Sequence, residues 1–236
     1  MSVNLQRHRE MLQHVAEALG AELRTQMAFV GGCTTGLLLT DAFSQEQVRH
    51  TDDVDLIVHV LGYADYDMLQ QRLRQRGFRD SLEQHDPICT MRLGALRVDF
   101  MPDDASVLGF GNQWYAEALQ TATPYILTET LSIRLIHPVY FVATKLEAYH
   151  GRGQNDPIGS QDIEDLLNLV EGRAELFADI QAASDGLKTY IGQQFSALLI
   201  HDGFADAIQD CTRGDQARAD LLFERLENIV KVYKSN

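Results

Sequence analysis

The sequence lacks the features of a membrane protein and of a chain held together by disulfide bonds. No apolar run approaches the roughly 20 residues that a membrane-spanning helix needs. The first residues, MSVNLQRHREMLQHV, have no continuous apolar stretch of the kind found in a signal peptide. The three cysteines, Cys33, Cys89 and Cys211, are far apart and lack metal-ligand spacing, which indicates reduced, mostly buried thiols and gives no support to a zinc site. We therefore expect a cytoplasmic protein without a membrane partner.

Positive charge is also scarce. The chain has 20 Lys and Arg against 34 Asp and Glu, a formal net charge of −14. Because an acidic surface repels phosphate backbones, we do not expect a large, unassisted nucleic-acid footprint. The charge leaves open a local basic groove, a phosphate ligand neutralised by metal, and a basic partner protein.

The 236 residues, 45% of them hydrophobic, are enough for one domain or two small ones. The pattern of apolar residues predicts an α/β (α+β) fold, with a small mixed-sheet domain at 1–105 and a mainly helical domain at 106–236. The first domain is expected to contain a helix from Leu5 to about Arg24, strands at 27–30 and 53–60, helices at 34–39 and 66–76, a hairpin of 88–93 with 96–101, and a loop at 41–50. The second is expected to contain a helix at 113–119, a short β pair at 125–127 and 132–136, and helices at 138–150, 160–171, 173–183, 187–201 and 215–233.

Asp53 and Asp55 are the first candidates for chemistry. They lie two residues apart on a predicted strand, so both side chains leave the same face. Carboxylates only about 6–7 Å apart along a strand repel each other unless a cation lies between them, and such hard oxygen ligands suit Mg²⁺. The alternative is a solvated strand with two aspartates of no special role. The unbroken apolar face of Val54, Leu56 and Val58 argues that the strand is anchored in a core.

Gly31 and Gly32 follow a buried strand and precede a helix start. Glycine allows a ligand to approach the backbone, and amides at the start of a helix bind phosphate; the alternative is an ordinary tight turn. Asp99 lies between Val98 and Phe100 on a later strand, on its non-core face. It is either a further metal ligand or an exposed strand aspartate.

The order of these features resembles the nucleotidyltransferase superfamily, whose fold is like that of DNA polymerase β. Residues 49–55 read RHTDDVD, close to the Arg-x-Thr-x-Asp-hydrophobic-Asp form of that family. The resemblance implies that the glycines contact a nucleoside triphosphate and that three strand carboxylates hold two Mg²⁺ ions, with Mn²⁺ as a substitute. It assigns catalysis and metal binding to Asp53, Asp55 and Asp99, and nucleotide binding to Gly31, Gly32, Arg49 and Thr51.

The second half of the chain resembles the subgroup related to the AbiEii toxins. That subgroup has a helix with proline and a later lysine, an arginine-containing loop, and a short helix carrying Asp-x-x-Asp. The matching residues are Pro138 with Lys145, Arg152, and Asp162 with Asp165. The resemblance adds Lys145, Arg152 and Asp162 to the nucleotide-binding residues. The alternatives are a surface lysine whose stem covers apolar atoms, and an aspartate stabilised by the dipole at the start of a helix.

The resemblance implies an enzyme that transfers an NMP group from an NTP to an acceptor hydroxyl and releases pyrophosphate. The acceptor stays open among a tRNA, a protein and a small molecule such as an aminoglycoside. The most specific biological expectation is the toxin of a toxin–antitoxin pair, with an antitoxin protein as partner. The alternatives are a catalytically silent nucleotide- or partner-binding protein of the same fold, and a carboxylate–metal phosphohydrolase.

Overall fold

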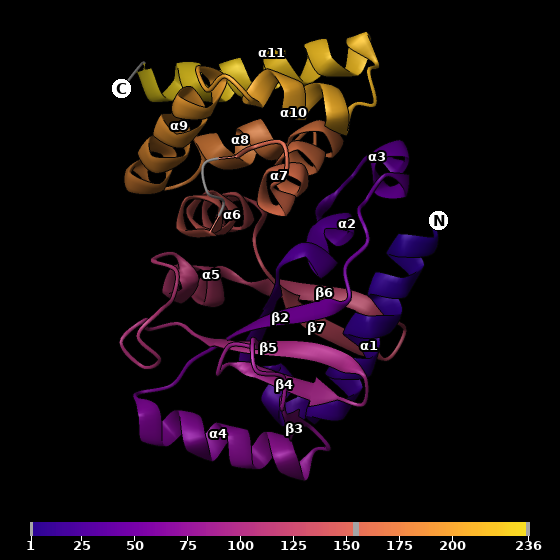
Figure 1. The fold of residues 1–236 in the computed structure, drawn as a ribbon, viewed down its shortest axis with the longest axis vertical. Coiled ribbons are helices and arrows are strands. Elements are labelled where there is room, and N and C mark those ends of the chain that lie inside the picture. The colour runs from indigo at the N-terminus through magenta and orange to yellow at the C-terminus, as the bar shows by residue number, and fades with distance from the viewer. Residues whose placement is uncertain (1, 153–155, 235–236) are drawn as a thin grey trace. The chain divides into compact units, whose positions relative to one another are not determined.

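The computed structural model in Figure 1 is a mixed α/β protein, which confirms the expected fold class. It describes residues 2–152 and 156–234, without the side chains of Arg152, Val232 and Lys234. Within these described ranges, seven strands form one sheet in the order β3-β4-β5-β2-β1-β7-β6. The strands are β1 Met27–Val30, β2 Asp53–Val58, β3 Arg79–Asp80, β4 Thr90–Leu93, β5 Leu96–Pro102, β6 Thr123–Thr128 and β7 Leu131–Leu135.

The helices precede, interrupt and follow these strands. None in the described ranges is long and apolar enough to cross a membrane. They are α1 Val3–Arg24, the 3-10 helix η1 Gly32–Thr34, α2 Thr35–Leu38, α3 Ala42–Glu46, α4 Tyr63–Gln75, α5 Tyr115–Thr121, α6 Pro138–Arg152, α7 Gln161–Gly172, α8 Leu176–Gln181, α9 Asp185–Leu199, α10 Phe204–Cys211 and α11 Gln216–Lys234.

The chain divides into two units, each described here by itself. The sheet unit comprises Val3–Thr34 and His50–Tyr140, and the helical unit comprises Ser2, Thr35–Arg49 and the described residues from Phe141 onward. Residues 106–140, which we assigned to the helical domain from the sequence, lie in the sheet unit because β7 pairs in parallel with β1 and β6 pairs with β7. Residues 35–49, assigned to the first domain, lie in the helical unit. The expected domains therefore do not coincide with the two units.

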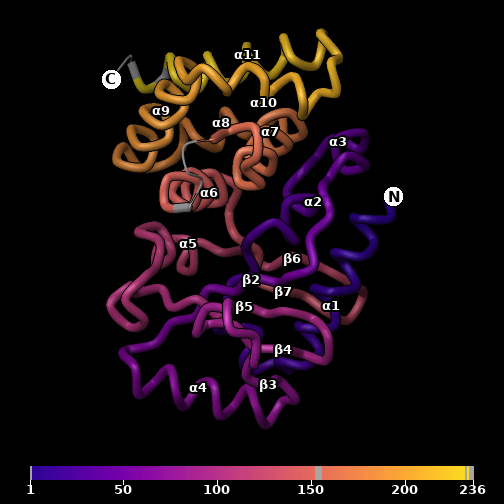
Figure 2. Tube along the Cα trace, in the orientation of Figure 1, coloured from indigo at the N-terminus to yellow at the C-terminus, as the bar shows by residue number. Residues whose placement is uncertain are grey.

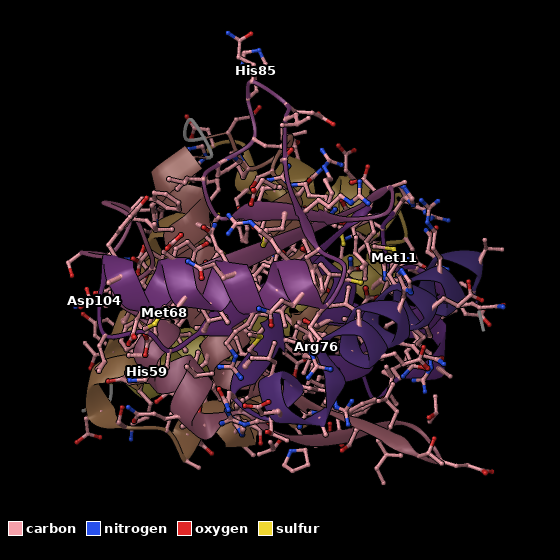
Figure 3. The ribbon with its side chains drawn as sticks, turned by 90° about the horizontal axis from the view of Figure 1, so that it is seen from below. Met11, His59, Met68, Arg76, His85 and Asp104 are labelled. Carbon is pink, nitrogen blue, oxygen red and sulfur yellow. The ribbon has the colours of Figure 1, made fainter. Side chains whose placement is uncertain are left out.

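The core of the sheet unit explains why β2 and β5 are held rigidly. Val54, Leu56, Val98 and Phe100 are fully buried and alternate with the candidate aspartates along both strands. The Phe100 ring makes an edge-to-face contact with the Phe78 ring at 5.4 Å between centroids. Figure 3 shows α4 and α1 side by side across one face of this unit. Burial of one side-chain set fixes the register, because a slip by one residue would turn the apolar side chains out of the core.

Three short elements differ from the sequence prediction. Helix α3 lies in the expected loop at 41–50, where the Asp41 carboxylate caps it by accepting a hydrogen bond from the Ser44 amide at 2.7 Å. Strand β3 has two residues, and α10 adds a helix between two expected ones. Elements as short as β3 and α3 contain too few apolar repeats to produce a periodic signal, whereas α10 buries Phe204, Ala207 and Ile208 at helical spacing and was overlooked.

Candidate functional site

The three candidate carboxylates come from two neighbouring strands in the middle of the sheet. Figure 2 shows β2 and β5 running side by side, and their parallel register sets Asp55 opposite Asp99 and Asp53 opposite Arg97. Adjacent strands are about 4.8 Å apart. Residues in register point to the same face, so Asp53, Asp55 and Asp99 share one face with Arg97. The structure thus brings together the three residues that the sequence predicted as a set.

Asp99 is held by two side chains that the sequence analysis did not identify. Arg97 donates from Nε to Oδ1 at 3.2 Å and from Nη2 to Oδ2 at 2.8 Å, and the Thr90 hydroxyl donates to Oδ1 at 2.6 Å. Asp99 is 7% exposed. Burial disfavours the charged guanidinium, but its hydrogen bonds to Asp99 and the charges of Asp99, Asp86 and Asp53 outweigh this and raise the pKa of Arg97. Arg97 therefore supplies positive charge next to the carboxylates of the candidate site.

Asp55 lies against the glycine turn. Gly31 has φ of +74°, and a Cβ at this position would lie 1.8 Å from Asp55 Oδ2. Only glycine both adopts this backbone conformation without strain and leaves room for the carboxylate. The Thr34 hydroxyl stabilises the turn by donating a hydrogen bond to the Gly31 carbonyl at 2.8 Å. Gly32 is the first residue of η1. The alternative of an ordinary tight turn does not explain why a carboxylate occupies the space of the missing side chain.

Asp53 and Thr51 are linked directly, because the buried Thr51 hydroxyl donates to Asp53 Oδ1. Thr51 thus orients a candidate metal ligand, whereas the family resemblance assigned it to the nucleotide. The nearby Cys89 thiol is buried, and burial together with the charges of Asp99 and Asp55 raises its pKa to about 12. A thiol with this pKa stays protonated at neutral pH and is a poor metal ligand. The expected burial is confirmed for Cys33 and Cys89, whereas Cys211 is half-buried, and none of the three forms a disulfide in the structure.

The carboxylate set fits Mg²⁺ in its chemistry. Three hard oxygen ligands lie on one face, and neither cysteine nor histidine competes among them. In the described part of the chain no group of three His, Cys, Asp or Glu side chains is arranged to hold a metal ion. At this site Arg97 engages both oxygens of Asp99.

The helical unit brings together a second set of predicted residues. Lys145 Nζ donates to Asp162 Oδ1 at 2.9 Å and to Asp165 Oδ2 at 2.6 Å. Arg49 forms a two-pronged bond to Asp165, with both N–O distances 3.0 Å. The side chain of Arg152, also predicted here, lies outside the described residues. Asp165, which the sequence analysis matched to the Asp-x-x-Asp pattern without giving it a role, is the central residue of this cluster.

The ion pairs of this cluster are buried. The Lys145 side chain is 9% exposed and that of Asp165 is 1% exposed, so Lys145 is not a surface lysine. Burial disfavours the charged form of both side chains, but attraction between opposite charges outweighs it. The charges of Asp165 and Asp162 raise the pKa of Lys145, and the charges of Lys145 and Arg49 lower the pKa of Asp165. Lys145 and Asp165 are therefore both ionised at neutral pH.

Neither a protein-family model nor a curated protein matches the chain.

Proposed function

We propose that the protein is a metal-dependent nucleotidyltransferase with a DNA polymerase β-like fold in its sheet unit, related to the AbiEii toxin-like subgroup. The supporting observation is the register that sets Asp55 opposite Asp99, with Asp53 on the same face. Three carboxylates this close are stable as ions only with cations among them. The adjacent Gly31 lets the Asp55 carboxylate lie directly against the glycine turn.

In this proposal Asp53, Asp55 and Asp99 hold Mg²⁺, with two ions expected and Mn²⁺ as a substitute. When held by these residues, the metal would lower the pKa of the acceptor hydroxyl and stabilise negative charge on the phosphates. Asp99 accepts the proton of that hydroxyl on a carboxylate oxygen. The acceptor oxygen then bonds to the α-phosphorus, while the bond from this phosphorus to the pyrophosphate oxygen breaks. The amides of Gly31 and Gly32 orient the triphosphate.

In the helical unit, Arg49, Lys145 and Asp162 remain proposed nucleotide-binding residues. The supporting observation is that Arg49 and Lys145 both form ion pairs with one buried carboxylate, Asp165, which fixes their charged groups in place. Asp165 is a positioning residue in this proposal. A fixed cation binds a phosphate with less loss of side-chain entropy than a mobile one does.

The acceptor and the biological setting are the least constrained parts of the proposal. A tRNA end, a protein or a small molecule remain candidates, and an antitoxin protein is the proposed partner. A cytoplasmic location is proposed because the three cysteines are free, which suits a reducing compartment.

One observation favours a second candidate, a catalytically silent nucleotide- or partner-binding protein of the same fold. The two-pronged bond from Arg97 already neutralises Asp99. In a silent protein this bond would persist in the presence of NTP and metal, and metal would not strengthen nucleotide binding.

The test of the proposed activity is the transfer of label from NTPs that carry radioactive α-phosphate to RNA, protein or small molecules of a cell extract. We expect labelling by the parent protein with Mg²⁺, and a loss of at least about a hundredfold in Asp53→Asn and Asp55→Asn, since each removes a metal ligand. The matched control is Asp52→Asn, an exposed neighbour. Equal labelling by the parent protein and the two ligand variants contradicts the proposal.

A further inference from the structure

Asp86, in the loop between β3 and β4, contacts the arginine that holds Asp99. Arg97 Nη1 lies 3.7 Å from Asp86 Oδ1, while Nε and Nη2 of the same guanidinium bind Asp99. The side chains of Asp86 and Asp99 are each 10% exposed. Arg97 therefore contacts two mostly buried carboxylates, of which one is a candidate metal ligand and the other is not.

Two further side chains hold the Asp86 carboxylate in position. The Ser81 hydroxyl donates to Asp86 Oδ2, and Arg92 Nη2 donates to the same oxygen at 2.9 Å. The hydrogen bond from Ser81, together with Arg92 and Arg97, outweighs the effect of burial and lowers the pKa of Asp86. Asp86 is therefore a fixed, negatively charged acceptor, and its Oδ1 is the oxygen in contact with Arg97.

The two contacts of Arg97 differ in strength. Its bond to Asp99 is two-pronged, whereas the distance of 3.7 Å to Asp86 is too long for a hydrogen bond. A movement of about 1 Å would convert the second contact into a hydrogen bond of ordinary length. The Arg97 side chain is 31% exposed, so close packing does not prevent such a movement.

A divalent cation at Asp99 would repel a guanidinium left beside it. Within the described residues, Asp86 and Asp99 are the carboxylates that form ion pairs with Arg97, so Asp86 is the partner that remains. We propose that Asp86 is a positioning residue for the candidate metal site, which receives the Arg97 guanidinium when a divalent cation takes Asp99. This inference rests on the metal-binding part of the proposed function and extends it to a residue outside the carboxylate set.

The experiment measures Mn²⁺ binding to the full chain without nucleotide, by electron paramagnetic resonance of free Mn²⁺. Asp86→Asn leaves Arg97 without its second partner and should raise the Mn²⁺ dissociation constant about fivefold, equal to about 1 kcal/mol, an ordinary value for an ion pair that is not fully buried. Asp86→Glu keeps the charge and should retain most of the affinity. The matched control is Glu83→Gln, which removes the same charge from the same loop but contacts Arg92 instead.

A double-mutant cycle separates a role through Arg97 from a general effect of charge. In an Arg97→Gln background no guanidinium needs a second partner, so Asp86→Asn should change the Mn²⁺ dissociation constant less than about twofold. Equal factors for Asp86→Asn in both backgrounds would overturn the inference, because they would show an effect of charge alone. Glu83→Gln with the same effect as Asp86→Asn would overturn it for the same reason.

A crystal structure of the parent protein with Mn²⁺ tests the inference without any variant. We expect Arg97 to have left Asp99 and to donate hydrogen bonds to Asp86. An Arg97 guanidinium that still binds Asp99, or that has turned into solvent away from Asp86, would overturn the inference.

The outcomes for this inference and for the proposed function can be distinguished. Mn²⁺ binding that depends on Asp86 through Arg97, in a protein that transfers no label from NTP, supports the inference and contradicts the proposed activity. Label transfer together with equal effects of Asp86→Asn in both backgrounds does the opposite. A parent protein that binds no Mn²⁺ contradicts both.

Discussion

At the scale of single residues, the site depends on the space beside Asp55. A Cβ added at Gly31 would collide with the Asp55 carboxylate, and the φ angle of Gly31 is positive. Gly31→Ala should therefore lower the free energy of unfolding by about 1–2 kcal/mol for the backbone conformation, with an added loss from displacing Asp55. Thermal unfolding and Mn²⁺ binding measure the two effects.

Gly109→Ala is the matched control for this prediction. Gly109 has φ of +79°, and nothing lies within 4 Å of a Cβ placed there. It should show the backbone cost alone and unchanged Mn²⁺ binding. The account of the glycine turn is wrong if both alanine variants behave alike.

Arg97 and a metal ion compete for Asp99 in this account. Arg97→Gln should therefore bind Mn²⁺ about tenfold more tightly, equivalent to about 1.4 kcal/mol, the low end for a hydrogen bond between charged groups. The metal-free variant should also melt at a lower temperature. Electron paramagnetic resonance of free Mn²⁺ gives the dissociation constant.

The control is Arg92→Gln. It removes a positive charge from the neighbouring strand β4, opposite Arg97, without removing a contact of Asp99. If Arg97 has only a structural role, Arg97→Gln should have a lower melting temperature and an unchanged Mn²⁺ dissociation constant. That result, or equal tightening in both variants, would refute the competition.

At the scale of elements, α7 places Asp162 and Asp165 in a buried cluster of ion pairs and not in solvent. The pKa of Asp165 is lowered because Lys145 and Arg49 outweigh the effect of burial. A lowered pKa means that this stability is present above the ordinary value of 3.8 and is lost as pH falls through the folded-state value. Asp165→Asn should lower the free energy of unfolding by about 3–5 kcal/mol at pH 7, because it leaves buried cations unpaired.

Urea unfolding followed by circular dichroism checks this pH dependence. The stability gap between the parent protein and Asp165→Asn should shrink as the pH is lowered below about 4, the unperturbed value for Asp. Asp162→Asn, which removes one contact with Lys145, should show a smaller gap at every pH. A gap for Asp165→Asn that is constant with pH speaks against an ionised Asp165.

Some of these elements were predictable from the sequence and others were not. Alternation placed Asp53 and Asp55 on one face of β2, because a period of two needs only local information. The pairing of Asp55 with Asp99 depends on which strands become neighbours, which no local pattern encodes. The same alternation places Arg97 on the face of Asp99, but its bond to that carboxylate depends on side-chain geometry that the sequence does not encode.

At the scale of the whole molecule, the two units explain why the expected boundary at residues 105 and 106 does not describe the chain. β6 and β7 complete the sheet after that point, and residues 35–49 join the helical unit by long-range contacts such as that of Arg49 with Asp165, 116 residues apart. Hydrophobic periodicity detects elements but contains no information on such partners. Asp53, Asp55, Asp99 and Arg97 all belong to the sheet unit.

The central claim is that the protein holds a nucleotide through metal bound by Asp53, Asp55 and Asp99. Isothermal titration calorimetry of ATP into the full chain tests it most directly, with Mg²⁺ and with EDTA. The account predicts that Mg²⁺ strengthens ATP binding by at least about tenfold, since metal and phosphates share a coordination shell, and that Asp55→Asn abolishes the gain while Asp52→Asn keeps it. Equal ATP affinity in Mg²⁺ and EDTA, or a full Mg²⁺ effect in Asp55→Asn, would contradict it.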